Sequence, residues 1–243
     1  MSRGPTVARV PFDSIRLFRE SFRDEAGCQI VRDSILGRGL ADAWEIRLAG
    51  KAIGYAGVWN TYDPGRLMEF WLDSGHRSEA EASYAAVLDA TRAHEVEAQT
   101  NVPLMHEMLT HFGATPRPSH HLFEVGDEEG PARAPSGLAF RPCEPGEGEE
   151  GEWAAVRNGE VVGTGGLLTH YNPPFADVYM AVRDGHRRQG VGSWLVRQLC
   201  GLARARGQIA AARCSVENEA SRRTLLRGGM DEVGQILVAD VRA

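Results

Sequence analysis

One pattern of residues occurs twice in this 243-residue sequence, and the repeat limits the folds that the chain can adopt. Six residues between positions 44 and 64 recur between positions 153 and 173 at the same internal spacings. The matching residues are Trp44 with Trp153, Gly50 with Gly159, Gly54 with Gly163, Gly57 with Gly166, Tyr62 with Tyr171, and Pro64 with Pro173. After a shift of one residue, the tripeptide Gly75-His76-Arg77 recurs as Gly185-His186-Arg187. We therefore predict two copies of one α/β unit rather than a solenoid of many short repeats.

The hydrophobic pattern of each copy predicts several strands and helices, which together form an α/β unit. Asn158-Gly159 lies between two apolar runs, which strongly indicates a β-hairpin, and Gly50-Lys51 lies at the matching turn. The stretch 126–137 is acidic and rich in Gly and Pro, which is typical of a linker. We predict a first domain over residues 1–126, a linker over 127–137 and a second domain over 138–243.

A basic loop that contains glycine follows the predicted strand 177–182 in the second copy. The loop ends with Gly190 and Gly192, and the residues after it have the apolar spacing of a helix. Glycines let the backbone approach a ligand closely, and the start of a helix favours a bound anion by about 0.3–1 kcal/mol. Arg187 and Arg188 add positive charge beside this site. The loop therefore predicts a site for a phosphate-bearing cofactor.

The two copies differ at this loop. Residues 189–192 of the second copy read Gln-Gly-Val-Gly, whereas the matching residues 79–82 of the first copy read Glu-Ala-Glu-Ala. Two carboxylates would repel a pyrophosphate, and two methyl groups would obstruct its approach to the backbone. We therefore expect no phosphorylated cofactor at this place in the first copy. The second copy lacks something else, because its residues 142–152 are too few to match the helices predicted at 13–36.

The glycine loop and its surroundings resemble the GNAT superfamily of N-acetyltransferases. The family signature is Gln or Arg, two residues, Gly, one residue, and then Gly or Ala, which the segment Arg187-Arg188-Gln189-Gly190-Val191-Gly192 matches. A second landmark is Asn, then an aromatic residue, then Gly-Phe. The residues at those places are Asn218, Leu225, Gly229 and Met230. Over both copies, the resemblance implies two tandem GNAT-like domains with a degenerate first copy. Each would be an α/β domain whose mixed, mostly antiparallel sheet is flanked by helices.

The resemblance implies acetyl-CoA, or another acyl-CoA, as the cosubstrate of the second copy. Backbone N–H groups of the loop would hold the pyrophosphate, and the preceding strand would pair with the pantetheine arm and polarise the thioester carbonyl. Asn218 would hydrogen-bond the same arm. The implied cofactor-binding residues are Met180, Ala181, Val182, Arg187, Arg188, Gln189, Gly190, Val191, Gly192, Ser193 and Asn218. An amine would attack directly in a ternary complex.

Acyl transfer to an amine needs an acid for the leaving thiolate and a base for the ammonium proton. The tyrosine that usually supplies the acid in this family would be at Leu225, so Cys214, Ser215 or a water would have to replace it. The candidate bases are Asp177, Tyr179, Glu217, and His170 with Tyr171. Three of these have structural alternatives: Tyr179 as a packed strand residue, His170 as a solvated loop residue, and Glu217 as part of a helix cap.

Two further groups of charged residues allow two interpretations each. Five glutamates (Glu144, Glu147, Glu149, Glu150 and Glu152) form either a solvated connector or a loop that attracts a cationic amine. Arg222 and Arg223 either reach the phosphates of the cofactor or lie exposed on a helix.

Composition excludes several classes of function. The net charge of −6 argues against nucleic acid as a partner. The four cysteines, including Cys28 and Cys143, have neither paired nor metal-ligand spacing, so we expect free thiols and no metal site. The N-terminus has no apolar signal core, and no stretch approaches the ~18 apolar residues of a membrane span. We therefore expect a cytoplasmic protein without a membrane partner.

Three functions fit these observations. The leading hypothesis is an N-acetyltransferase that acts on the primary amine of a small molecule. The second is a non-catalytic sensor or scaffold that binds acetyl-CoA, and the third is a protein acetyltransferase that modifies N-termini or lysines. The identity of the acceptor, the acyl chain length and the oligomeric state are left open by the sequence.

Overall fold

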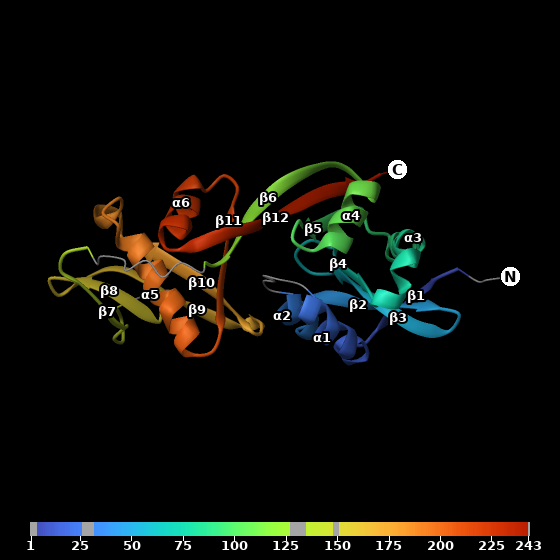
Figure 1. Ribbon diagram of the computed structural model, residues 1–243, viewed down its shortest axis with the longest axis horizontal. Coiled ribbons are helices and arrows are strands. Elements are labelled where there is room, and N and C mark those ends of the chain that lie inside the picture. Colours follow the sequence, from blue (N-terminus) through green and yellow to red (C-terminus); the bar gives the residue numbers. More distant parts are fainter. Residues whose placement is uncertain (1–3, 26–31, 127–134, 148–150, 243) are drawn as a thin grey trace. The chain divides into compact units, whose positions relative to one another are not determined.

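The computed structural model describes residues 4–25, 32–126, 135–147 and 151–242 (Figure 1). These residues form two compact units. The first unit consists of Met1–His120 together with Gly234–Ala243, and the second consists of His121–Val233.

The first unit is a mostly antiparallel sheet with helices on both sides. Its elements are β1 (Thr6–Val10), η1 (Phe12–Ile15), α1 (Arg16–Glu25), α2 (Arg32–Gly37), β2 (Ala41–Leu48), β3 (Lys51–Trp59), β4 (Arg66–Leu72), η2 (Ser74–Glu79), α3 (Ala80–Thr91), β5 (Glu95–Gln99) and α4 (Pro103–Phe112). Its strands lie in the order β1-β2-β3-β4-β5, and β4 and β5 are parallel neighbours. Figure 1 shows α1 and α2 on one side of these strands, and α3 and α4 on the other.

The second unit repeats this order of elements without the first helices. It contains β7 (Leu138–Pro142), β8 (Trp153–Arg157), β9 (Glu160–Asn172), β10 (Phe175–Val182), η3 (Asp184–His186), α5 (Val191–Ala205), β11 (Ile209–Ser215) and α6 (Glu219–Arg227). The strand order is β11-β10-β9-β8-β7, with β10 and β11 parallel. Among the described residues between β7 and β8 there is no helix, as the short connection predicts. The predicted fold class, α/β with a mostly antiparallel sheet in each copy, is confirmed.

Two long strands, β6 (Gly113–Val125) and β12 (Met230–Val241), each contribute residues to both units. The end of β12 pairs with β5, from Ile236↔Gln99 to Asp240↔Glu95, so the last residues of the chain belong to the first unit. The end of β6, from His121, belongs to the second unit. These bounds differ from the predicted division at 126 and 138, because strands join a unit through hydrogen bonds rather than through sequence proximity. Residues 127–134 of the predicted linker lie outside the described residues.

Glycine is required at the repeated positions for the same structural reasons in both units. At the hairpin turns, Ala49 and Gly50 have φ of 49° and 83°, and Asn158 and Gly159 have φ of 54° and 83°. Two consecutive left-handed residues are typical of the type I′ turn, which suits the twist of the strands. Within the next strands, a Cβ on Gly54 would be 2.1 Å from the carbonyl oxygen of Trp71. A Cβ on Gly163 would be 2.9 Å from the carbonyl oxygen of Ala181.

Each unit has a hydrophobic core of its own. In the first unit, α1, α3 and α4 pack apolar residues such as Phe22, Tyr84 and Met108 against the sheet. In the second unit, α5 packs its predicted apolar face against β9, β10 and β11, with Trp194 and Leu199 buried. No helix in the described part of the chain is long and apolar enough to cross a membrane.

Candidate active site

The parallel strands β10 and β11 separate within the second unit. They pair at three positions, from Phe175↔Ile209 to Asp177↔Ala211. Beyond Asp177, β10 continues beside β9 to Val182, and β11 continues to Ser215. In the described part of the chain, Met180, Ala181 and Val182 of β10 therefore have no recorded partner in β11. We call this end of the strand pair the opening, since an extended ligand could pair with strand backbone there.

Two left-handed residues shape the loop between η3 and α5. Arg188 has φ of 60°, and Gly190 has φ of 80° with ψ of 0°. Such changes of backbone conformation turn successive N–H groups toward one side and create a concave anion site. The first backbone hydrogen bond of α5 runs from the N–H of Trp194 to the carbonyl of Gly190, at 3.1 Å. The N–H groups of residues 191–193 precede this bond, so they project from the end of the helix.

Gly192 lies where α5, α6 and β10 meet. A Cβ there would be 3.0 Å from Cγ2 of Thr224 and 3.5 Å from Cγ2 of Val182, so glycine permits this close packing. At Gly190, the reason for glycine is the left-handed backbone itself. The donors at this loop are uncharged N–H groups beside basic side chains, and this set fits a pyrophosphate.

The side chains of the loop hold its shape. The amide of Gln189 accepts a hydrogen bond from Nη1 of Arg157 at 2.6 Å, and donates one to the carbonyl of Gly185 at 3.1 Å. Arg187 donates to the carbonyl of Val182 at 3.1 Å and pairs with Asp184 at 2.9 Å. These contacts hold Gln189 and Arg187 against their own unit, and the backbone N–H groups of residues 191–193 are left for a ligand.

Asp177 lies at the last pair between β10 and β11, at the closed end of the opening. Burial raises the pKa of its carboxyl group from 3.8 to about 6, and the positive charge of Arg213 partly opposes this shift. A carboxylate with a pKa near neutrality is suited to accept a proton at physiological pH. Sequence reasoning missed Arg213, although strand alternation puts it on the same face of β11 as Ser215.

Tyr179 is directed away from the opening. Its ring lies over Gly166 of β9, where a Cβ would be 2.4 Å from the tyrosine hydroxyl oxygen. Burial and the nearby charge of Glu152 raise the pKa of Tyr179, although the backbone N–H of Glu152 donates a hydrogen bond to the hydroxyl group. This geometry favours the interpretation of Tyr179 as a packed strand residue.

The candidates after β11 have local roles as well. Asn218 begins α6, and its side-chain oxygen accepts a hydrogen bond from the N–H of Ser221 at 3.0 Å. The NH₂ group of Asn218 is therefore the part left to bind a cofactor. Glu217 is exposed, and its N–H donates to the hydroxyl of Ser215 at 3.3 Å. His170 is exposed too, and the side chain of Tyr171 lies outside the described residues.

Two positions considered for the acid lie in the core. Leu225 is 5% exposed, and Cys214 is 8% exposed within the same hydrophobic cluster. Burial also raises the pKa of the Cys214 thiol, which keeps it protonated and away from solvent. Of the groups considered as replacements for the missing tyrosine, the partly exposed Ser215 and a water remain.

The two groups of charged residues noted in the sequence form ion pairs with neighbouring residues. Arg222 donates two hydrogen bonds to Glu232, at 2.9 and 2.7 Å, and Arg223 pairs with Glu219 at 2.7 Å. In the acidic loop, Arg141 binds Glu147 with two hydrogen bonds of 2.5 and 2.6 Å. These bonds lower the pKa of Glu147 to about 2. The contacts favour structural roles for Arg222, Arg223 and Glu147, while Glu149 and Glu150 lie outside the described residues.

No cluster of three or more His, Cys, Asp or Glu side chains in the described part of the chain is arranged to hold a metal ion. Comparison with known proteins shows which family part of the chain resembles. Residues 118–229, which include the opening and the glycine loop, match the acetyltransferase (GNAT) family model. In this part the chain is therefore similar to GNAT acetyltransferases.

Solved GNAT structures share the fold of the whole chain. An acetyltransferase of the GNAT family from Colwellia psychrerythraea has a TM-score of 0.78 at 12% identity, and the match covers 98% of this chain and 100% of that one. A tandem GNAT protein from the clavulanic acid biosynthesis pathway has a TM-score of 0.60 at 12% identity, with 98% and 99% covered. A GCN5-related N-acetyltransferase from Sphaerobacter thermophilus has a TM-score of 0.58 at 17% identity, with 98% and 96% covered. A search of curated proteins found no match.

Proposed function

We propose that the second unit is an N-acetyltransferase that transfers an acetyl group from acetyl-CoA to the primary amine of a small molecule. The observation that carries the proposal is the combination of two features in one unit. The strand edge from Met180 to Val182 borders the β10–β11 opening, and the glycine loop at Gly190 and Gly192 follows that edge directly. The same unit contains most of the residues that match the GNAT family model.

The binding roles follow from this arrangement. The N–H groups from Arg188 to Ser193 would hold the pyrophosphate, and the edge of β10 would hold the pantetheine arm together with Asn218. Acetyl-CoA supplies an acetyl group that is activated as a thioester. An N–H of the β10 edge would polarise the thioester carbonyl, because a fixed backbone donor stabilises charge that develops on an oxygen.

Asp177 is the base that the structure supports best among the predicted candidates. With a pKa of about 6, its carboxyl group is mostly ionised at pH 7.5, and it can accept a proton from an ammonium group directly or through a water. The amine then attacks directly in the ternary complex. A thiol has a pKa of about 8.5, so the leaving thiolate needs less help from an acid than an alkoxide does. Leucine at position 225 is therefore compatible with the reaction.

Calorimetry with acetyl-CoA tests the proposal first. We expect saturable binding to the parent chain and none to Gly190→Glu, because the variant places a charged side chain on the loop. A thiol-release assay over a panel of small primary amines then tests for catalysis. If acetyl-CoA does not bind, or if Gly190→Glu binds as well as the parent, the proposed site is wrong.

Leu225 also favours a second candidate function, a non-catalytic module that binds acetyl-CoA. Its side chain lies in the core, where it offers no acid group. The same two assays separate the candidates. Binding without thiol release from any amine in the panel would support the module, whereas amine-dependent release would support the enzyme.

A further inference from the structure

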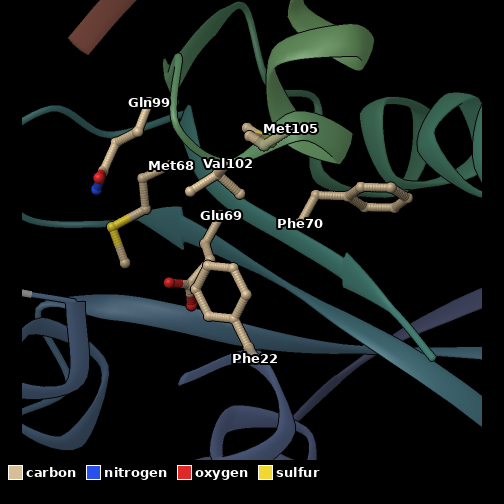
Figure 2. A pocket seen from close by; sticks show the side chains of 7 residues that line it. All are labelled: Phe22, Met68, Glu69, Phe70, Gln99, Val102 and Met105. Carbon is tan, nitrogen blue, oxygen red and sulfur yellow. The ribbon is translucent and has the colours of Figure 1, made fainter. Parts of the chain in front are cut away.

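The two units differ in what covers one face of the matching strands β4 and β10. In the first unit, α1 covers the face of β4 that carries Glu69, because Arg19 of α1 donates a hydrogen bond to Glu69 at 2.5 Å. Figure 2 shows Phe22 of α1 and Glu69 among the residues around a space with room for about one water molecule. This face of the first unit is therefore filled by its own side chains.

The matching face of β10 carries Asp177 and Tyr179. Asp177 is at the last pair before the parallel strands separate, and Tyr179 follows it two residues later on the same face. α5 covers the opposite face, where Val178 and Met180 belong to the core. Among the described residues the second unit has no counterpart of α1, and Asp177 keeps part of its surface exposed. An acceptor can therefore approach Asp177 from this face.

Arg213 is the charged residue that β11 places on this same face. Asp177 pairs with Ala211, and Arg213 follows Ala211 by two residues. Strand side chains alternate between faces, and Ala212 and Cys214, on either side of Arg213, lie in the core that α5 covers. Two residues span about 6.6 Å of strand, so Arg213 lies beyond the last pair, where β10 and β11 have separated. Its side chain therefore borders the opening on the face from which an acceptor would approach.

The charge of Arg213 is available to a ligand. Its side chain is exposed, and no hydrogen bond or ion pair of Arg213 occurs within the described part of the chain. By contrast, Arg141 and Arg222 of the same unit each bind a glutamate. Arg213 acts on Asp177 only through a longer-range attraction, which partly opposes the rise in the pKa of that carboxyl group. A positive and a negative charge thus lie on one face of the opening without forming an ion pair.

We propose that Arg213 binds a carboxylate group of the acceptor, so that the acceptor is an amino acid, with a primary amine and a carboxylate in one small molecule. The proposal rests on the proposed function of the second unit and names the class of its acceptor. A guanidinium group binds a carboxylate through two parallel hydrogen bonds. The ionised carboxylate of Asp177 attracts the ammonium end, and Arg213 attracts the carboxylate end. A simple alkylamine would leave Arg213 without a partner.

Three amino acids and their carboxamides test the assignment. Glycine, β-alanine and 4-aminobutyrate differ in the length between the amine and the carboxylate, and each amide keeps the amine and the shape of its amino acid without the negative charge. In the thiol-release assay, we expect the kcat/KM of the best amino acid to exceed that of its own amide at least about tenfold, because the amide cannot form the charged pair. An amide or a simple alkylamine that is used as fast as the best amino acid would overturn the proposal.

Arg213→Gln provides the matched variant, with a polar side chain that has no charge. We expect it to raise the KM of the amino acid about tenfold, and to leave kcat and the KM of the amide within about twofold, because Arg213 acts in binding alone. The control is Arg206→Gln, which changes an exposed arginine at the far end of α5 from the glycine loop and should alter none of these values. An unchanged KM for the amino acid in Arg213→Gln would contradict the assignment.

A binding experiment separates this proposal from the proposed function. With the full chain, at least one of the three amino acids should shift the backbone amide resonances of residues 175–179 and 209–215, and the shifts should be lost in Arg213→Gln. If acetyl-CoA fails to bind, the proposed function is wrong, while these shifts would still support carboxylate binding by Arg213. If acetyl-CoA binds but the parent and Arg213→Gln respond alike to the amino acids, this proposal alone is wrong.

Discussion

The two units have the same order of strands and helices, yet they differ at two matching positions. At the last pair before the parallel strands separate, the first unit has the buried Leu67 and the second has Asp177. At the start of the following helix, the first unit continues from η2 into α3 through Glu79 and Ala80, which both have negative φ, of −94° and −59°. The second unit instead has the left-handed residues Arg188 and Gly190. The first unit thus keeps the fold without either feature, so the fold itself does not require them.

The largest effect is expected from placing a carboxylate in the loop of the second unit, since carboxylates lie at Glu79 and Glu81 in the first unit. Gly190→Glu should weaken acetyl-CoA binding at least about a hundredfold, because a carboxylate repels the pyrophosphate and the left-handed backbone resists a side chain. The matched control is Ala80→Gly, which introduces glycine at the equivalent place in the first unit. It should create no second binding event in calorimetry, because Glu79 and Glu81 remain. Two equivalents of acetyl-CoA bound to Ala80→Gly would show that glycine alone makes the site.

Replacing Asp177 should change activity and stability in opposite directions. Asp177→Asn is expected to lower kcat by about 10²–10³ through loss of the base. In the parent, kcat/KM should fall as the pH decreases through about 6, the raised pKa of Asp177. A variant that keeps full activity and this pH profile would exclude Asp177 as the base.

The same substitution should raise stability, since the folded state holds the Asp177 carboxylate at a cost. The pKa is raised from 3.8 to about 6, so the folded state binds the proton more tightly than the unfolded state. The stability of the parent therefore falls as the pH rises through this window, and Asp177→Asn should gain about 2–3 kcal/mol above pH 6. The gain should vanish below about pH 4. Urea unfolding at pH 4 and pH 7.5 measures it, and a loss of stability at pH 7.5 would contradict the assigned cause.

The repeated strand glycines should differ in how strictly they are needed. A Cβ at position 54 would be 2.1 Å from a backbone oxygen, whereas at position 163 the distance would be 2.9 Å. Gly54→Ala should therefore cost about 3 kcal/mol and Gly163→Ala about 1 kcal/mol, within the usual range for overpacking. Denaturant unfolding of both variants measures the difference. Equal costs would mean that the strands adjust equally well in the two units.

The smallest expected effect concerns the conformation of the loop. Arg188 has φ of 60°, which favours glycine, so Arg188→Gly should raise stability by up to about 0.5 kcal/mol. The matching residue Ser78 lies in η2, where glycine should cost about 0.5–1 kcal/mol. Thermal unfolding of the two variants should therefore show shifts of opposite sign. Shifts of the same sign would contradict the difference in backbone conformation.

Local patterns predicted much of the fold. The hairpin turn at Asn158-Gly159 and the apolar face of α5 are confirmed, because each depends on residues close together in sequence. The lengths of β6 and β12 were not predicted, because their ends pair with strands that are distant in sequence. The roles of the site residues remain predictions, although the structure distinguishes Asp177 at the opening from Tyr179, which lies across β9.

The sequence by itself determined that the chain contains one α/β unit twice and that the glycine loop occurs in the second copy. Turn chemistry and glycine positions are local, so the order of residues is enough to reveal them. The tertiary structure alone decided that Asp177 lies at the end of the opening and that Leu225 and Cys214 face a core. These features depend on which strands separate and which helices cover them, and contacts between distant residues determine both.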